Sequence, residues 1–169
     1  ANLAVVSSYD LCGNGFECQE FFKDIITLIV PDGHPWAIRD SVDPDDLLDE
    51  PMVIREPTSG TRRVMLTEFA KHDIGLDDLD IFLELGNAEA IARTVEAGFG
   101  VSFISTLAAD WALKLGRIVS VPVADFELQR TIYMVRRALD TPNRAQEAFW
   151  NFVHDPSNAD LLRLAGQQA

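Results

Sequence analysis

The segment Glu56–Arg62, EPTSGTR, constrains the fold of this chain more than any other part of the sequence. The short apolar run Met52–Ile54 precedes it and predicts a buried strand, while an apolar pattern of helical period follows it. A strand that ends in proline, small hydroxyl side chains and glycine before a helix leaves backbone N–H groups without partners. Those groups, together with the positive end of the helix dipole, favour the binding of an anion or a polar ligand.

A second strand-to-helix junction repeats this arrangement further along the chain. The apolar segment Phe82–Leu85 leads through Gly86 and Asn87 into a helix that begins at Ala88. Two helix N-termini on one sheet indicate a pocket that binds a small molecule without transforming it.

Apolar periodicity predicts strands and helices that alternate along the chain. Strands are predicted at 2–7, 24–31, 51–56, 79–85, 100–104, 117–122 and 127–136. Helices are predicted at 59–73, 87–97, 105–114 and 142–153, with a single turn at 43–48, a short helix at about 158–164 and a loop at 9–19. Such alternation favours a mostly parallel sheet that is covered on both faces.

The strands predicted at 24–31 and 127–136 are longer than the others and bracket the central α/β unit. A lobe inserted between two such strands forms a hinge with a cleft. We therefore expect residues 21–127 to form one lobe, and residues 1–20 with 128–169 to form part of another. That second lobe contains too few predicted strands to be complete.

Charge and composition restrict the classes of function. A net charge of −13 repels nucleic acid, so we do not expect this segment to bind DNA itself. An apolar content of 47% with 24% charged residues is typical of a globular domain, and no apolar run approaches the roughly 20 residues that span a bilayer. The chain starts without methionine and without a signal-peptide pattern, so we expect a piece of a longer cytoplasmic protein with no membrane partner. The arginine pairs at 62–63 and 136–137 are expected to be solvated.

The cysteines and histidines offer little reactive chemistry. Cys12 and Cys18 have five residues between them in a loop rich in Gly and Asn, a spacing compatible with a disulfide or a redox switch. Two isolated thiols in a chain without an export signal favour reduced, structural cysteines instead. The histidines His34, His72 and His154 lie too far apart for a metal site, so we expect neither a metal nor a cofactor.

Four segments in order resemble a known family: LAVVSS at 3–8, LIVPDGHP at 28–35, REPTSGTR at 55–62 and VEAGFGV at 95–101. From about residue 3 to 152 the chain resembles the effector-binding domain of LysR-type transcriptional regulators. The family's winged helix-turn-helix, its linker helix and the first elements of its first lobe have no counterpart in this sequence. The resemblance implies a periplasmic-binding-protein-like α/β fold with two Rossmann-like lobes joined by crossover strands. It also implies a small effector in the cleft, assembly as a homodimer or homotetramer, and contact with DNA only through the missing N-terminal domain.

The resemblance further implies which residues contact the ligand. They lie at the end of the first strand, at both helix starts and around the Gly98–Gly100 turn: Ser7, Ser8, Thr58, Ser59, Gly60, Asn87, Ala88, Phe99 and Ser102. Arg55 or Arg62 is expected to assist in binding a small metabolic anion. Thr58, Ser59 and Asn87 are equally favoured as helix N-caps, so a purely structural role fits the same residues.

Two other functions use the same architecture, because fold alone does not determine function. An enzyme would need a nucleophile or a titrating pair in the cleft, and only Glu56 and His72 are candidates. No serine has the G-x-S-x-G setting and no acid pair has a catalytic spacing, so we predict no catalytic residue. An exported solute-binding protein is disfavoured by the missing export signal, and a winged helix-turn-helix about 100 residues upstream would favour the regulator.

Overall fold

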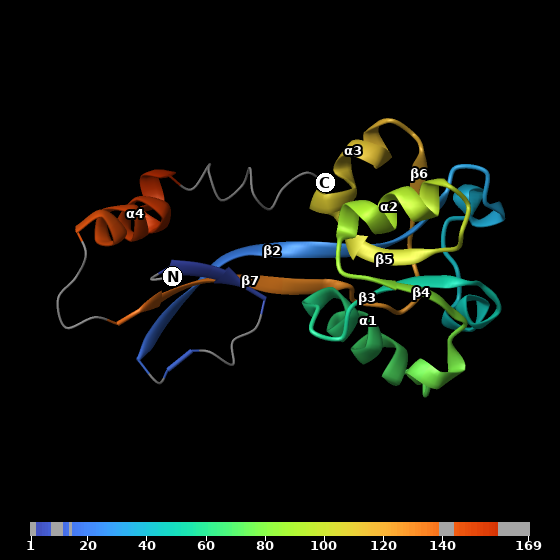
Figure 1. Cartoon of the computed structure of the whole chain (residues 1–169), viewed down its shortest axis with the longest axis horizontal. Coiled ribbons are helices and arrows are strands. Elements are labelled where there is room, and N and C mark those ends of the chain that lie inside the picture. The colour runs from blue at the N-terminus through green and yellow to red at the C-terminus, as the bar shows by residue number, and fades with distance from the viewer. Residues whose placement is uncertain (1–2, 8–11, 14, 139–143, 159–169) are drawn as a thin grey trace. The chain divides into compact units, whose positions relative to one another are not determined.

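The computed structural model describes residues 3–7, 12–13, 15–138 and 144–158 (Figure 1). The chain forms two compact units, one made of residues 1–24 and 130–169 and the other of residues 25–129. The polypeptide passes from one unit to the other within β2 (Phe16–Pro31) and returns at the start of β7 (Gln129–Arg137).

Unit 25–129 contains a sheet in which some strands are parallel and β2 is antiparallel to its neighbours. The strands β3 (Met52–Arg55) and β4 (Ile81–Leu85) are parallel, with Met52 opposite Ile81 and Arg55 opposite Leu85. Met52 also forms a parallel bridge with Val101, which directly precedes β5. The expectation of a mostly parallel sheet is therefore confirmed for β3, β4 and β5.

The same expectation is wrong for β2. This strand pairs antiparallel with β5 (Ser102–Ser105), where Ile26 lies opposite Ser105. It also pairs antiparallel with β6 (Ile118–Val121), where Leu28 lies opposite Val121. β2 enters the unit from outside and not through a crossover within the unit, so it need not run parallel to β5.

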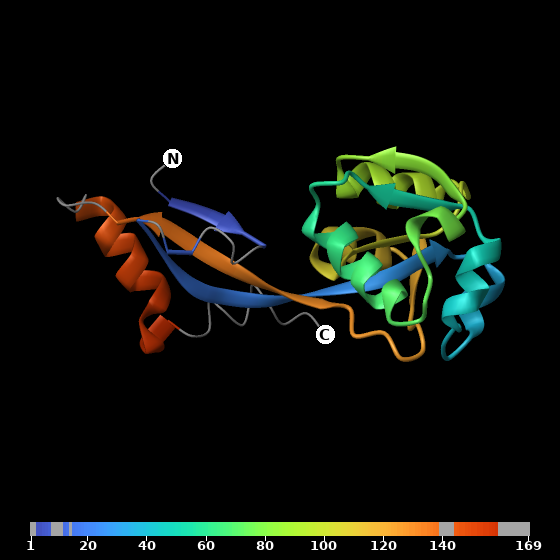
Figure 2. The same ribbon diagram turned by 90° about the horizontal axis from the view of Figure 1, so that it is seen from below.

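Helices cover both faces of this sheet, as the alternation predicted (Figures 1 and 2). Met52 and Ile54 point to the face covered by α1 (Gly60–Ala70), where they meet Phe69. Val53 points to the other face and packs with Ile91 and with residues of α2 (Ala88–Glu96) and α3 (Thr106–Lys114). None of the described helices combines the length and the apolar character needed to cross a bilayer.

Short 3₁₀ helices complete the unit: η1 (Pro35–Ile38), η2 (Pro44–Asp49) and η3 (Leu76–Asp78). The second of them confirms the single turn predicted at 43–48, and Asp43 is its N-cap. Its acidic first turn and proline start are typical of a helix N-terminus.

Glu68 on α1 fastens the chain that leads from β6 to β7. Both of its carboxylate oxygens lie 2.8 Å from Lys71 Nζ, and Oε2 accepts a hydrogen bond of 3.0 Å from the Glu127 N–H. Burial raises the pKa of Glu68, but the bonds from Lys71 and Glu127 outweigh it and lower the pKa on balance. The stabilisation is therefore present above the ordinary glutamate pKa and is lost as the pH falls through the lowered value.

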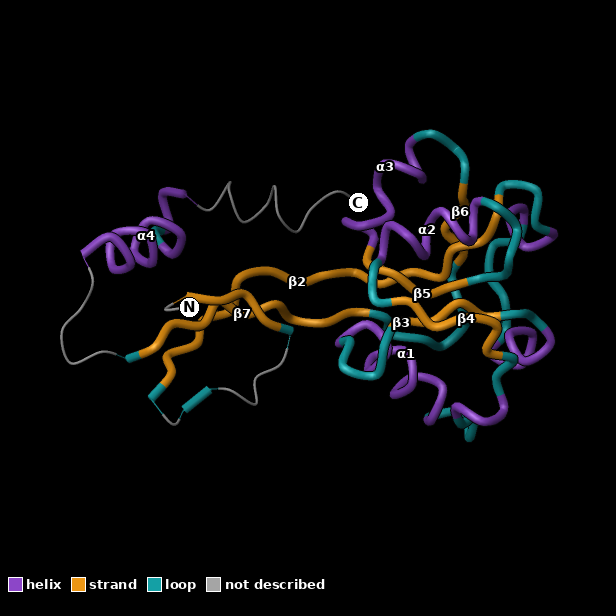
Figure 3. Tube along the Cα trace, in the orientation of Figure 1, coloured by secondary structure: helices purple, strands orange, loops and turns teal. Residues whose placement is uncertain are grey.

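The described residues of unit 1–24 with 130–169 form paired strands followed by helical segments (Figure 3). β1 (Leu3–Val6) pairs antiparallel with β7, and β7 neighbours β2. On α4 (Arg144–His154), Trp150 packs with Met134 of β7, and η4 (Pro156–Asn158) follows. Buried Asp24 on β2 accepts bonds of 2.8 and 2.7 Å from Nε and Nη2 of Arg130, which joins the two strands by a buried ion pair.

Several other predictions need correction. The loop predicted at 9–19 is wrong for residues 16–19, which already belong to β2. The arginine pairs are not simply solvated, because Arg62 is buried and Arg136 lies between Glu17 and the Trp150 ring. The short helix predicted at about 158–164 falls outside the described residues except for Asn158.

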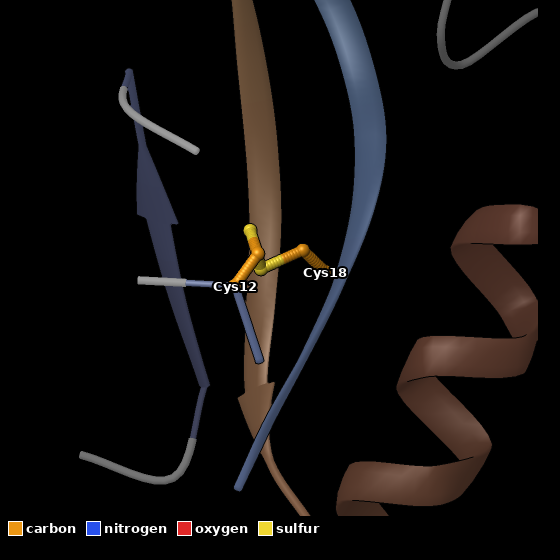
Figure 4. The surroundings of a disulfide bond; sticks show 2 residues. All are labelled: Cys12 and Cys18. Carbon is orange, nitrogen blue, oxygen red and sulfur yellow. A yellow bond between two sulfur atoms is a disulfide. The ribbon is translucent and has the colours of Figure 1, made fainter. Parts of the chain in front are cut away.

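The prediction of reduced cysteines is also wrong, because Cys12 and Cys18 form a disulfide (Figure 4). Gly13 and Phe16 exchange backbone hydrogen bonds of 3.2 and 2.9 Å, which folds the segment back on itself. The two cysteine Cα atoms lie 5.6 Å apart as a result, a separation that suits a disulfide. The sequence spacing alone did not reveal this local turn.

A substitution at Gly100 tests the close approach of two strands in this sheet. The φ of +126° at this residue disfavours any side chain, and a Cβ there would lie 2.2 Å from the carbonyl oxygen of Pro51. That same oxygen accepts the Val101 N–H at 2.9 Å, so the close approach belongs to the parallel pairing. We expect Gly100→Ala to lower the free energy of unfolding by at least about 2 kcal/mol in urea titrations.

Gly33→Ala is the matched control, because a Cβ at Gly33 would meet no atom within 4 Å. Equal stability of the two variants would contradict the close approach of β3 to the start of β5.

Candidate functional site

Three helices begin at one edge of the sheet in unit 25–129. Since β3, β4 and β5 run in one direction, their carboxyl ends meet at the same edge, and each is followed by a helix. The N-caps are Ser59 for α1, Asn87 for α2 and Ser105 for α3. The sequence alone pointed to the first two starts and missed the third, although Ser105-Thr106 after a predicted strand is the same kind of signal.

At the start of α1, the hydroxyl of Ser59 is part of the helix cap. Ser59 is only 5% exposed, and its Oγ accepts a hydrogen bond of 3.2 Å from the Thr61 N–H. Its own N–H donates to the Glu56 carbonyl at 3.0 Å and closes a turn. Thr58 is exposed on this turn and Gly60 is half-buried, so Thr58 offers its side chain to solvent more than Ser59 does.

At the start of α2, Asn87 combines exposure with a capping bond. Its Oδ1 accepts the Ala90 N–H at 2.9 Å, while Ala88 beside it is half-buried. The structure thus brings Thr58, Ser59 and Gly60 to the same sheet edge as Asn87 and Ala88.

The two arginines expected to assist are bonded to glutamates in this structure. Arg55 donates from Nε and Nη2 to the two carboxylate oxygens of Glu56, at 2.7 and 2.9 Å. Arg62 donates from Nη1 to Glu84 at 2.6 Å and to the Arg55 carbonyl at 3.0 Å. The hydrogen bond from Arg55 lowers the pKa of Glu56, and each of the two arginines is paired with one glutamate.

A hollow of about 300 Å³ opens at this edge beside the start of α3. Its polar lining consists of the hydroxyl side chains of Thr27, Thr106 and Ser120, and its apolar lining includes Phe126 and Leu128. Thr27 Oγ1 and Ser120 Oγ share a hydrogen bond of 2.5 Å. The hollow therefore offers hydroxyl groups in an otherwise apolar wall, a composition common in small-molecule sites.

The structure does not bring Phe99 together with the helix starts. The Gly98–Gly100 turn follows the end of α2 and precedes β5, so the parallel topology places it at the opposite edge. There Phe99 stacks with Phe82 at a centroid distance of 6.1 Å. Both rings line a separate hollow of about 230 Å³ that also contains His34 and Glu50.

Of the remaining predicted residues in this unit, Ser102 does not belong to this edge. Ser102 is fully buried, and its Oγ donates to the Val53 carbonyl at 2.6 Å, which commits the hydroxyl to the sheet. Ser7 follows β1 in the other unit and is half-buried, and Ser8 lies outside the described residues. Over the part of the chain that the structure describes, no group of His, Cys, Asp and Glu side chains suits a metal ion.

Solved structures share this fold. The CcmR regulatory domain of Synechocystis PCC6803, solved in complex with 2-PG, superimposes with a TM-score of 0.77 at 23% identity over 90% of this chain and 71% of that chain. The effector binding domain of QuiR in complex with shikimate also gives 0.77, at 22% identity over 90% and 69% of the two chains. The protein therefore has the periplasmic-binding-protein-like α/β fold of these regulatory domains, as expected.

Sequence comparison then gives the family. Residues 1–156 match the LysR substrate binding domain, and the chain belongs to this family. An uncharacterized HTH-type transcriptional regulator of Methanocaldococcus jannaschii is 34% identical over 143 residues, which cover 85% of this chain and 48% of the relative. The HTH-type regulator CbbR of Rhizobium meliloti is 31% identical over 135 residues, covering 80% and 42%. The chain thus spans less than half the length of these relatives.

The burial of Ser102 leads to a prediction about its role. We expect Ser102→Ala to lower the free energy of unfolding by about 1–3 kcal/mol, because the Val53 carbonyl loses a buried donor. Urea unfolding measures this loss, with exposed Ser41→Ala as the control. A variant of unchanged stability that binds ligand more than about tenfold more weakly would instead place Ser102 in contact with the ligand.

Proposed function

We propose that this chain is the effector-binding part of a LysR-type transcriptional regulator. It binds a small anion at the edge of unit 25–129 where α1, α2 and α3 begin. The observation that carries the proposal is the convergence of three helix N-termini at one sheet edge. Each N-terminus adds partial positive charge, so their effects on an anion at this edge reinforce one another.

Backbone donors are the main binding groups in this proposal. Roughly the first four N–H groups of a helix have no partner within the helix. Side-chain caps occupy the N–H of Thr61 in α1 and that of Ala90 in α2. The N–H groups of Arg63 and Ile91 bond to the carbonyls of the caps Ser59 and Asn87. The donors left to ligand or water include those of Gly60 and Ala88, and the hydroxyls of Thr58 and Thr106 lie beside the helix starts.

The states of Glu56 and Ser59 support the binding of a ligand without its chemical conversion. A general base works best with a pKa near the working pH, whereas Arg55 holds the pKa of Glu56 below its ordinary value. Glu56 is therefore a weak base, and Ser59 bonds to backbone groups of its own loop and helix. Relatives carry the names of transcriptional regulators, which also supports a sensor over an enzyme.

The wider role follows from the family. In this proposal residues 21–127 form one lobe, and residues 1–20 with 128–169 form part of the other. The ligand shifts a conformational equilibrium by its different affinity for two states, with a coupling of about 1–3 kcal/mol. The full-length protein passes this shift to DNA through a helix-turn-helix domain, as a homodimer or homotetramer in the cytoplasm.

Thermal unfolding against a panel of small anions tests the proposal. The panel contains sulfate, phosphate and small carboxylates, with 2-PG and shikimate added because they occupy the two structural neighbours. A ligand at 100 times its dissociation constant should stabilise the chain by about 2.7 kcal/mol. Unchanged unfolding temperatures with every member, for protein that is folded by circular dichroism, would contradict the proposal.

A variant at Thr58 locates the ligand. Ser59 is buried, so a large side chain there would strain the fold, whereas Thr58 is exposed beside the start of α1. We expect Thr58→Glu to weaken anion binding by about tenfold through charge repulsion, and Thr58→Gln, of similar size but neutral, to change it little. Equal affinities of the two variants would place the anion away from α1.

A further inference from the structure

The Glu56 carboxylate is bonded to Arg55 in the way that the carboxylate of a bound ligand would be. Two parallel N–H···O bonds, of 2.7 and 2.9 Å, join the guanidinium to both carboxylate oxygens. This two-pronged arrangement is the one in which arginine recognises a free carboxylate or phosphate. It lies between the last residue of β3 and the turn that opens α1, at the edge assigned above to the effector.

Accessibility separates Arg55 from its neighbour Arg62. The Arg62 side chain is 9% exposed, and its Nη1 is held by both Glu84 and the Arg55 carbonyl. The side chains of Arg55 and Glu56 are 19% and 31% exposed. Solvent, and therefore a small anion, reaches the guanidinium of Arg55 more easily than that of Arg62.

We propose that Glu56 is an internal competitor of the effector, occupying Arg55 until an anionic ligand displaces it. The ligand then takes the two guanidinium bonds and lies against the start of α1, while the Glu56 carboxylate turns to water. This inference rests on the proposed function, and it adds Arg55 as the charged group that selects the ligand and Glu56 as the residue that sets the affinity threshold.

The chemistry of the ligand follows from this competition. Glu56 is covalently next to Arg55, so its effective concentration at the guanidinium is high. Only a ligand that also offers two acceptor oxygens, such as a carboxylate, a phosphate or a sulfate, replaces both bonds. A ligand with hydroxyl groups alone lacks the charge to do so.

The affinity for sulfate should depend on pH through the protonation of Glu56. Glu56 is ionised at neutral pH, and the bond from Arg55 moves its pKa still further below that range, so competition is constant there. As the pH falls through this lowered value, the carboxyl becomes neutral and releases Arg55. Sulfate, which stays ionised, should then bind wild-type protein more tightly.

Calorimetric titration with sulfate at low ionic strength tests the competition. We expect Glu56→Gln to bind sulfate about tenfold more tightly than wild type, and Arg55→Gln to lose most of the binding. Asp46→Asn is the matched control, because it makes the same change in net charge on an exposed pair with Arg39, in η2 before β3. Glu56→Asp keeps the charge but shortens the reach, so it should also bind more tightly and guards against misfolding of one variant.

The outcomes separate this inference from the proposed function. Affinity of Glu56→Gln equal to that of Asp46→Asn, or lower than that of wild type, would overturn the competitor. So would an absence of sulfate binding in both wild type and Glu56→Gln, even if another panel member still stabilised the chain and supported effector binding. A gain in affinity that disappears at low pH, where wild type approaches Glu56→Gln, is the result that the competitor requires.

Discussion

The parallel pairing of β3 with β4 and with Val101 is the constraint on which the candidate site depends. It places the end of each strand, and the start of the helix that follows, at the same edge of the sheet. An antiparallel pairing would send the starts of α1 and α2 to opposite edges. The pairing is held by cores on both faces, around Phe69 on one side and Ile91 on the other. Gly100 permits the contact by leaving room for the Pro51 carbonyl.

Local groups must overcome the charge of the whole chain for an anion to bind at this edge. The net charge of −13 repels anions at long range, but salt screens that repulsion beyond roughly 10 Å. Within this distance the helix starts attract an anion, while Glu56 and Glu84 neutralise the two arginines. In our proposal, anion binding at this edge therefore depends on whether the interaction of the ligand with Arg55 is more favourable than that of Glu56.

Local signals in the sequence predicted the elements of unit 25–129 and the residues at two helix starts. Ser59 and Asn87 were identifiable because N-cap preferences depend on adjacent residues alone. The position of Phe99 depends on strand order, and the burial of Ser102 depends on its bond to Val53, a residue distant in sequence. The ion pair of Arg62 with Glu84 and the disulfide of Cys12 with Cys18 likewise require the chain to be folded before they can be recognised.

The most direct measurement is a backbone amide NMR titration of the ¹⁵N-labelled chain with an anion that stabilises it. If the helix starts bind the anion, the largest shifts fall at the first-turn amides of α1, α2 and α3, including Gly60, Ala88 and Thr106. Shifts concentrated instead around Phe82 and Phe99, at the other edge of the sheet, would contradict the account.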